Sequence, residues 1–75
     1  MPYIAVKAYP KDPEIQKRVA ERINQVFLEE WGCPPEAISI SMESIAPELW
    51  ETTVVKNEIE PKQEAMLILH GQKKY

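Results

Sequence analysis

The first nine residues constrain the fold most, because a proline stands at the second position of an alternating apolar stretch. The stretch from Met1 to Tyr9 predicts a β-strand. Proline donates no ladder hydrogen bond, so Pro2 is tolerated only where that strand begins. We expect Met1 to be removed because the residue behind it is small, which would leave Pro2 with a free secondary amine. An α-amino group has an unperturbed pKa of roughly 7.7–8.0, and partial burial lowers it toward neutrality, where a general base is most useful.

Length and composition predict one small domain, residues 1–75, that depends on self-association. A chain of 75 residues buries only about 60–65% of the surface that its unfolded form exposes. Its single cysteine, Cys33, excludes an internal disulfide, and with one histidine it offers no zinc motif. Neither Cys33 nor His70 is expected to carry chemistry. We therefore expect a homodimer, or a higher homo-oligomer, to supply the missing apolar burial.

Charge and hydropathy exclude several classes of partner. The formal net charge is −3, and acidic and basic residues are interspersed, which disfavours binding to nucleic acid or to an anionic membrane. No apolar run approaches the ~18 residues of a membrane-spanning helix, and we expect no leader segment. We therefore predict a cytoplasmic protein that acts on a small molecule and needs no metal or cofactor.

An amphipathic helix is predicted between Asp12 and Gly32. Asp12 suits the N-cap and Pro13 the first turn, while Gly32 suits the position that follows the last turn. The helix is expected to be about 18 residues long, with charged residues on its outer face. Its apolar stripe consists of Ile15, Val19, Ala20, Ile23, Val26, Phe27 and Trp31.

Residues 37–45 alternate cleanly and predict a second strand. A strand, a helix and a strand in this order form a right-handed crossover, so the two strands should be parallel. The predicted fold class is α/β (α+β), a short β-α-β unit with short C-terminal helical segments, completed by oligomerisation. Two strands alone leave open sheet edges, which calls for another subunit.

The C-terminal third is less clearly patterned. Pro47 opens a helical turn over residues 46–50, whereas residues 51–57 stay open because Thr-Thr-Val-Val favours a strand. Pro61 opens a second predicted helix over residues 62–69, which ends at Gly71. The tail, residues 72–75, is expected to be loose or to dock on a partner.

The chain resembles the tautomerase superfamily typified by 4-oxalocrotonate tautomerase, and within it the dimeric phenylpyruvate-type branch. The resemblance covers nearly the whole chain and rests on the Met-Pro start, the length and the β-α-β order. The stretches that carry it are Met1-Pro2-Tyr3-Ile4, Ile38-Ser39-Ile40, Ile45-Ala46-Pro47-Glu48-Leu49-Trp50, Glu58-Ile59-Glu60-Pro61 and Gln63-Glu64-Ala65.

This resemblance implies cofactor-free keto–enol tautomerisation of a 2-oxo acid, with Pro2 as general base and acid. Members of the family usually place a large aromatic residue over the substrate, and Trp50 stands at that position. They also bind carboxylates with an arginine on the second strand and another before the helix. Here those positions hold Ser39 and, before the helix, Lys11 and Asp12. This departure favours an aromatic monocarboxylate such as phenylpyruvate enol, with Ser39 and Lys11 as candidate contacts.

Two other functions stay open. A non-catalytic oligomer that keeps the fold for binding or assembly would tolerate the missing arginines. A related proline-dependent reaction, such as hydration or dehalogenation of an unsaturated acid, would still use Pro2. If Met1 stays attached, the nitrogen of Pro2 is an amide without basicity, which would favour the non-catalytic hypothesis.

Overall fold

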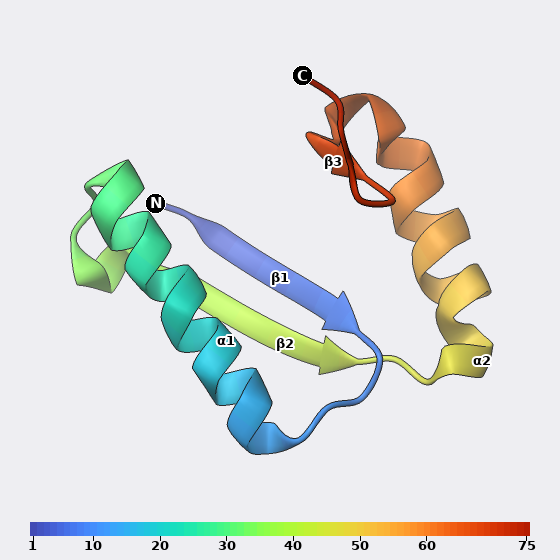
Figure 1. Ribbon diagram of the computed structural model, residues 1–75, viewed down its shortest axis with the longest axis horizontal. Coiled ribbons are helices and arrows are strands. Elements are labelled where there is room, and N and C mark those ends of the chain that lie inside the picture. The colour runs from blue at the N-terminus through green and yellow to red at the C-terminus, as the bar shows by residue number, and fades with distance from the viewer. The chain divides into compact units, whose positions relative to one another are not determined.

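The computed structural model describes residues 1–75, which form two compact units, Met1–Ile45 and Ala46–Tyr75. The first unit contains β1 (Tyr3–Ala8), α1 (Pro13–Val26) and β2 (Ser39–Ser44), and the second begins with α2 (Pro47–Trp50) and ends with two short strands, β3 (Ile68–Leu69) and β4 (Gln72–Lys73) (Figure 1). The order of the first three elements is the predicted β-α-β order.

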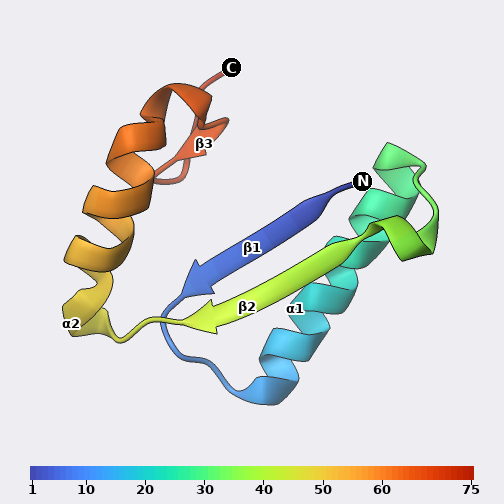
Figure 2. The same cartoon turned by 180° about the vertical axis from the view of Figure 1, so that it is seen from behind.

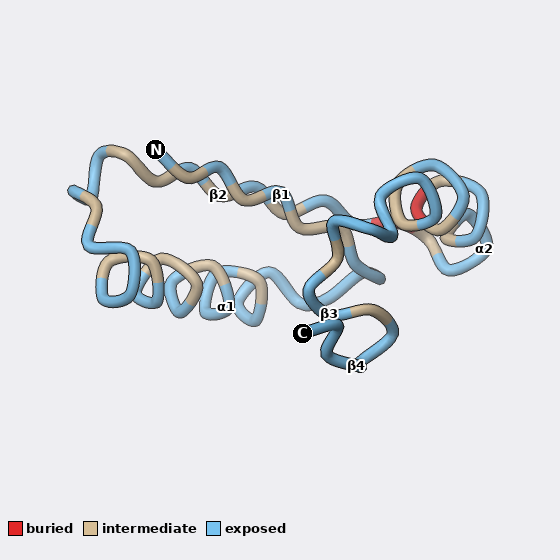
Figure 3. Tube along the Cα trace, turned by 90° about the horizontal axis from the view of Figure 1, so that it is seen from above, coloured by how far each residue is buried: buried red, intermediate tan, exposed pale blue.

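In the first unit β1 and β2 pair in parallel, which confirms the predicted crossover. The register runs from Tyr3 opposite Ser39 to Ala8 opposite Ser44. Helix α1 lies in a second layer over one face of this two-stranded sheet, and its half-buried residues lie on the side that faces the strands (Figure 3). Figure 2 shows the opposite face of the sheet. The half-buried strand residues that alternate onto the helix-covered face are Ile4, Val6, Ile40 and Met42.

The predicted ends of the long helix are confirmed. One carboxylate oxygen of Asp12 accepts a hydrogen bond of 2.8 Å from the backbone N–H of Glu14, and Pro13 is the first helical residue. Beyond α1 the helix widens into a π-helical turn, η1 (Phe27–Trp31). Gly32 ends it with φ 66° and ψ 22°, a left-handed conformation that glycine adopts without steric cost.

The second unit is mainly helical from Pro47 to Ala65, with changes in the winding of the helix and a kink at Lys62, whose φ of −112° and ψ of 18° are not helical. Pro47 opens α2 as predicted; a π-helical segment, η3 (Glu51–Ile59), and a 3₁₀ segment, η4 (Glu60–Ala65), follow. Residues 51–57, which the sequence left open, are therefore helical. β-Propensity describes how well a side chain suits a half-buried pleated surface, so it yields to tertiary burial, and Val54 is only 5% exposed.

The predicted helix over residues 62–69 is wrong beyond its first turn. The 3₁₀ segment ends at Ala65, and Met66 has extended backbone angles of φ −76° and ψ 127°. Ile68–Leu69 then pairs antiparallel with Gln72–Lys73. The segment that was expected to form a helix thus provides one strand of a hairpin.

The turn of this hairpin explains the difference. His70 and Gly71 have φ values of 49° and 81°, and two successive positive φ values are what a two-residue hairpin turn of type I′ requires. Gly71 therefore closes a turn instead of stopping a helix. The tail is also more ordered than predicted, because the backbone N–H of Lys74 donates a hydrogen bond of 2.7 Å to the carbonyl oxygen of Leu67.

Few side chains of the chain are fully covered. Only Ile45 and Val54 are buried, at 7% and 5% exposed. A single copy of the chain therefore has a very small apolar core. No helix of the structure is both long enough and apolar enough to cross a membrane. Large apolar side chains that stay at least half exposed are Met1, Tyr3, Val26, Trp31, Leu49, Leu67, Ile68 and Tyr75.

Candidate active site

Pro2 lies at the amino end of β1 and is held there through its backbone. Its carbonyl oxygen accepts a hydrogen bond of 3.2 Å from the backbone N–H of Ser39, the first residue of β2. The Pro2 residue is half-buried, whereas Met1 is 98% exposed. A Pro2 amine, once free, would therefore project from a fixed strand end and not from a loose tail.

Ser39 shares this end of the sheet with Pro2, but alternation separates their side chains. Tyr3 pairs with Ser39 across the ladder, and both residues are exposed. Successive side chains of a strand point to opposite faces, so Pro2 belongs to the helix-covered face with Ile4. Within one chain, the Ser39 hydroxyl is therefore on the other face of the sheet from the Pro2 ring.

The helix-covered face near Pro2 carries an aromatic pair that the sequence analysis treated only as part of the helix stripe. Helix α1 runs antiparallel to β1, so its carboxyl end and η1 lie at the end of the helix–sheet layers where β1 starts (Figures 1 and 3). There the rings of Phe27 and Trp31 have their centroids 5.0 Å apart and their planes tilted by 49°. Trp31 is 67% exposed.

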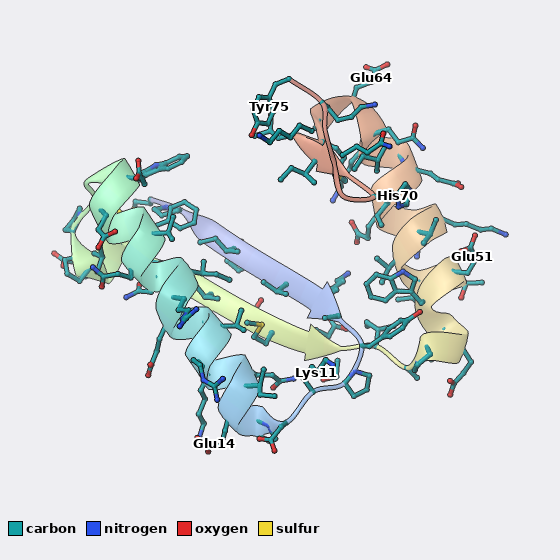
Figure 4. The ribbon with its side chains drawn as sticks, in the orientation of Figure 1. Lys11, Glu14, Glu51, Glu64, His70 and Tyr75 are labelled. Atoms are coloured by element: carbon teal, nitrogen blue, oxygen red, sulfur yellow. The ribbon has the colours of Figure 1, made fainter.

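Lys11 lies at the opposite end of β1, in the loop that leads into α1 (Figure 4). From Tyr3 to Ala8 the strand alone extends about 16 Å, and Lys11 comes three residues later. The structure thus places the backbones of Pro2 and Ser39 side by side, with their side chains on opposite faces of the sheet, and separates Lys11 from both of them.

A small cavity of about 100 Å³ adjoins Lys11 between α1 and the carboxyl ends of the strands. Its surface is mainly apolar, and Lys11 and Glu43 are the two charged residues that line it. The charged lining thus consists of one positive and one negative side chain. The remaining lining residues are Val6, Ala8, Tyr9, Ile15, Gln16, Val19 and Met42.

Trp50 belongs to the second unit, where it ends α2 and is half-buried. Its expected role over the substrate stays a prediction. The structure contains no group of three or more His, Cys, Asp or Glu side chains arranged to bind a metal ion, and the Cys33 thiol lies 3.8 Å from the backbone carbonyl oxygen of Phe27.

Comparison with known proteins decides the family. The chain is 32% identical over 69 residues to Tautomerase PptA of Shigella sonnei (strain Ss046), a match that covers 89% of this chain and 91% of the relative. Tautomerase PptA of Escherichia coli O127:H6 is also 32% identical over the same shares of the two chains. The chain belongs to the tautomerase superfamily. No family model matches it.

Membership makes this protein an isomerase of the tautomerase type, which favours the enzyme hypothesis over a non-catalytic binding protein. Tautomerase PptA of Escherichia coli K12, strain DH10B, is 30% identical and gives the same assignment. The Met-Pro start, the parallel β-α-β unit and the helical turn at Pro47 agree with the family resemblance seen in the sequence.

Proposed function

We propose that this tautomerase interconverts the enol and keto forms of a 2-oxo acid, with Pro2 as the general base and acid after Met1 has been removed. The position of Pro2 carries the proposal. Pro2 follows a nearly fully exposed Met1, and its carbonyl oxygen accepts a hydrogen bond from Ser39 on the neighbouring strand. An exposed residue ahead of a fixed one is accessible to a peptidase, and its removal converts an amide nitrogen into a secondary amine.

The reaction is a balanced proton transfer. The neutral Pro2 amine takes the proton from the enol oxygen, the carbonyl double bond forms as the carbon–carbon double bond shifts, and the protonated amine delivers a proton to carbon 3. The amine ends as it began, so no cofactor is consumed. A base with a pKa near the working pH both accepts and returns the proton readily, and a secondary amine at the end of a strand meets this need.

The carboxylate of the substrate needs a cation, and we propose Lys11 of a second copy of the chain. Within one chain β1 separates Lys11 from Pro2, and a 2-oxo acid with one aromatic ring is shorter than this strand. Two copies related by a two-fold axis place the amino end of one β1 near the carboxyl end of the other when the strands run antiparallel. Lys11 of one copy can then bind the carboxylate while Pro2 of the other transfers the proton.

Homodimerisation follows from the same proposal and from the uncovered surface. The sheet of the first unit has two strands, so both are edge strands, and edge strands are normally covered or paired. With only two buried side chains, a second copy would supply the apolar burial that so small a chain lacks. We place this dimer in the cytoplasm.

The substrate class that we favour is an aromatic monocarboxylate such as phenylpyruvate enol. The cavity beside Lys11 is mainly apolar and is lined by one positive and one negative side chain, which disfavours a second carboxylate. Trp50 would supply an aromatic wall, as its equivalent does in the family. Ser39 offers a hydroxyl to the substrate only from the open face of the sheet, so it would serve a site built between subunits.

Intact mass spectrometry combined with a tautomerase assay tests the proposal. The purified protein should begin at Pro2 and convert phenylpyruvate enol without added metal or cofactor. A matched preparation in which one residue is inserted between Met1 and Pro2, so that Pro2 keeps an amide nitrogen, should fold but lose activity. Equal activity in the two preparations would rule out the proline mechanism.

A further inference from the structure

We infer that Trp31, supported by Phe27, is a specificity residue that contacts the aromatic body of the substrate at Pro2. The inference rests on the proposed function and adds a residue that neither the sequence motifs nor the relatives assign. Its starting point is the exposure of Trp31, which at 67% is the most exposed member of the apolar stripe; its other exposed members are Ile15, Val19 and Val26, at 40–53%.

The two rings lie in η1, the turn in which the helix ends. Phe27 and Trp31 are four residues apart and therefore occupy the same side of the helix. Phe27 is half-buried, while Trp31, one turn later, is exposed. The apolar stripe of the helix thus ends in an uncovered indole.

Pro2 lies at the amino end of β1, at this same end of the sheet. By alternation its ring lies on the helix-covered face, the same side as the stripe of α1, and the amino end of β1 and the carboxyl end of the helix lie at the same end of the two layers (Figures 1 and 3). Trp31 and Pro2 therefore border the same open end of the helix–sheet layer. A substrate whose carbon 3 meets the Pro2 nitrogen would have this indole within the range of its side group.

The indole is held in place instead of being free to swing. Its ring packs against Phe27 at 5.0 Å between centroids with a tilt of 49°, within the range preferred by aromatic pairs. Directly after it, Gly32 fixes the end of the helix in the left-handed conformation, and Pro34-Pro35 restricts the chain that follows. A rigid aromatic surface loses little entropy when a second ring packs on it.

The charges at this end also favour an apolar side group. Glu29 and Glu30 are exposed in η1 beside Trp31, and η1 contributes no cation. Two carboxylates repel a carboxylate-bearing side group and do not affect a phenyl ring. The substrate carboxylate would point the other way, toward Lys11 of the second copy, and leave the aryl group at Trp31.

Two single-tryptophan variants test this assignment directly, because the chain has two tryptophans. Trp50→Phe leaves Trp31 as the sole indole, and Trp31→Phe leaves Trp50. Titration with benzoylformate, an aryl 2-oxo acid without a hydrogen on carbon 3, should quench the emission of Trp31. A response of Trp50 alone would overturn the inference and leave the proline mechanism intact.

Kinetics then separate specificity from folding. Trp31→Ala should lower kcat/KM for phenylpyruvate enol by about 2- to 12-fold, the equivalent of one aromatic contact, mainly through KM. The enol of an aliphatic 2-oxo acid should be converted as well as by the parent protein. Val26→Ala, which truncates another exposed side chain on the same helix, should affect neither substrate.

An equal loss on both substrates would mean that Trp31 acts on the structure and would overturn the inference. Trp31→Phe keeps an aromatic ring and should retain most of the preference, which guards against a variant that fails to fold. A large loss of activity in Pro2→Ala, together with an unaltered preference in Trp31→Ala, would refute the role of Trp31 while supporting the proposed reaction.

Discussion

The backbone N–H of Ser39 donates a hydrogen bond of 3.2 Å to the carbonyl oxygen of Pro2. This bond extends the parallel ladder by one residue beyond the first register pair, Tyr3 and Ser39. The bond holds the carbonyl group of Pro2, while the nitrogen of Pro2 is bonded only within its ring and to Met1. Removal of Met1 would therefore expose an amine on a residue whose carbonyl group is already fixed.

Replacement of Pro2 by alanine should separate catalysis from folding. The hydrogen bond to Ser39 uses the backbone carbonyl, which alanine retains, so we expect the far-UV circular dichroism and the thermal midpoint to change little. The rate on phenylpyruvate enol should fall by about 10²- to 10⁴-fold, the usual contribution of an acid–base group. Turnover equal to that of the parent protein would show that another group transfers the proton.

Removal of the helix cap should destabilise the first unit. Asp12 accepts a hydrogen bond of 2.8 Å from the N–H of Glu14, and Asp12→Ala should lower the free energy of unfolding by about 0.5–2 kcal/mol. Asp12→Asn retains an acceptor oxygen and should lose much less. Denaturant unfolding at one fixed protein concentration measures both variants, and equal losses would mean that charge, not the hydrogen bond, is what matters at this position.

Most of the first unit could be predicted from the sequence because its signals are local and agree with one another. Apolar and polar residues alternate before Pro10 and after Pro35, which predicts two strands. The helix between them begins after the N-cap Asp12 and ends at Gly32. A crossover of this kind has a fixed hand and makes the strands parallel. No long-range information was needed for this part of the fold.

The second unit was predicted less well because its signals conflict. Pro61 and the residues after it favour a helix, and Gly71 suits a helix end as well as a hairpin turn. The deciding feature is the positive φ of 49° at His70, a residue type that adopts this conformation only occasionally. The local sequence therefore does not predict this turn.

The candidate site was predicted in part. The chemistry of Pro2 follows from its residue type and position, and its proximity to Ser39 follows from the strand register. The order of the elements places Lys11 at the far end of β1. The proposal of a site shared by two chains depends in addition on the length of that strand, which separates Lys11 from Pro2. The exposure of Trp31 could not be predicted, because periodicity alone places it in the core stripe.

A stable dimer is the next expectation. Sedimentation velocity at micromolar concentration should show twice the mass of the chain, and dilution should lower the thermal midpoint because dissociation and unfolding are linked. A mixed sample of Pro2→Ala and Lys11→Ala chains tests the shared site. Each variant alone should be weakly active, and subunit exchange should restore activity in the mixed dimers, in which one of the two sites keeps both residues.

Activity that stays at the level of the separate variants after exchange would place Pro2 and Lys11 in the same site of one chain, or remove Lys11 from the site. Mass spectrometry of the intact dimer under native conditions confirms that exchange has taken place. A monomer at micromolar concentration would contradict both the dimer and the shared site.

Substrate preference should follow from the single cation near the apolar cavity. Phenylpyruvate enol should be converted with a higher kcat/KM than a hydroxymuconate-type dienol dicarboxylate, because Glu43 lines the same cavity as Lys11 and repels a second carboxylate. Lys11→Ala should lower kcat/KM for the aromatic substrate by about 10- to 150-fold, the equivalent of the roughly 1.5–3 kcal/mol of a hydrogen bond to a charged group. Trp50→Ala should lower it as well if the indole covers the substrate.

Lys17→Ala is the matched control, since Lys17 is a 72% exposed lysine on α1 with a partner, Glu14, at 3.6 Å. Its removal should leave both substrates unaffected. Lys11→Arg should lower KM, because a guanidinium group binds a carboxylate through two parallel hydrogen bonds and an ammonium group does not. Preference for the dicarboxylate in the parent protein, or an effect of Lys11→Ala no larger than that of Lys17→Ala, would refute this account of the site.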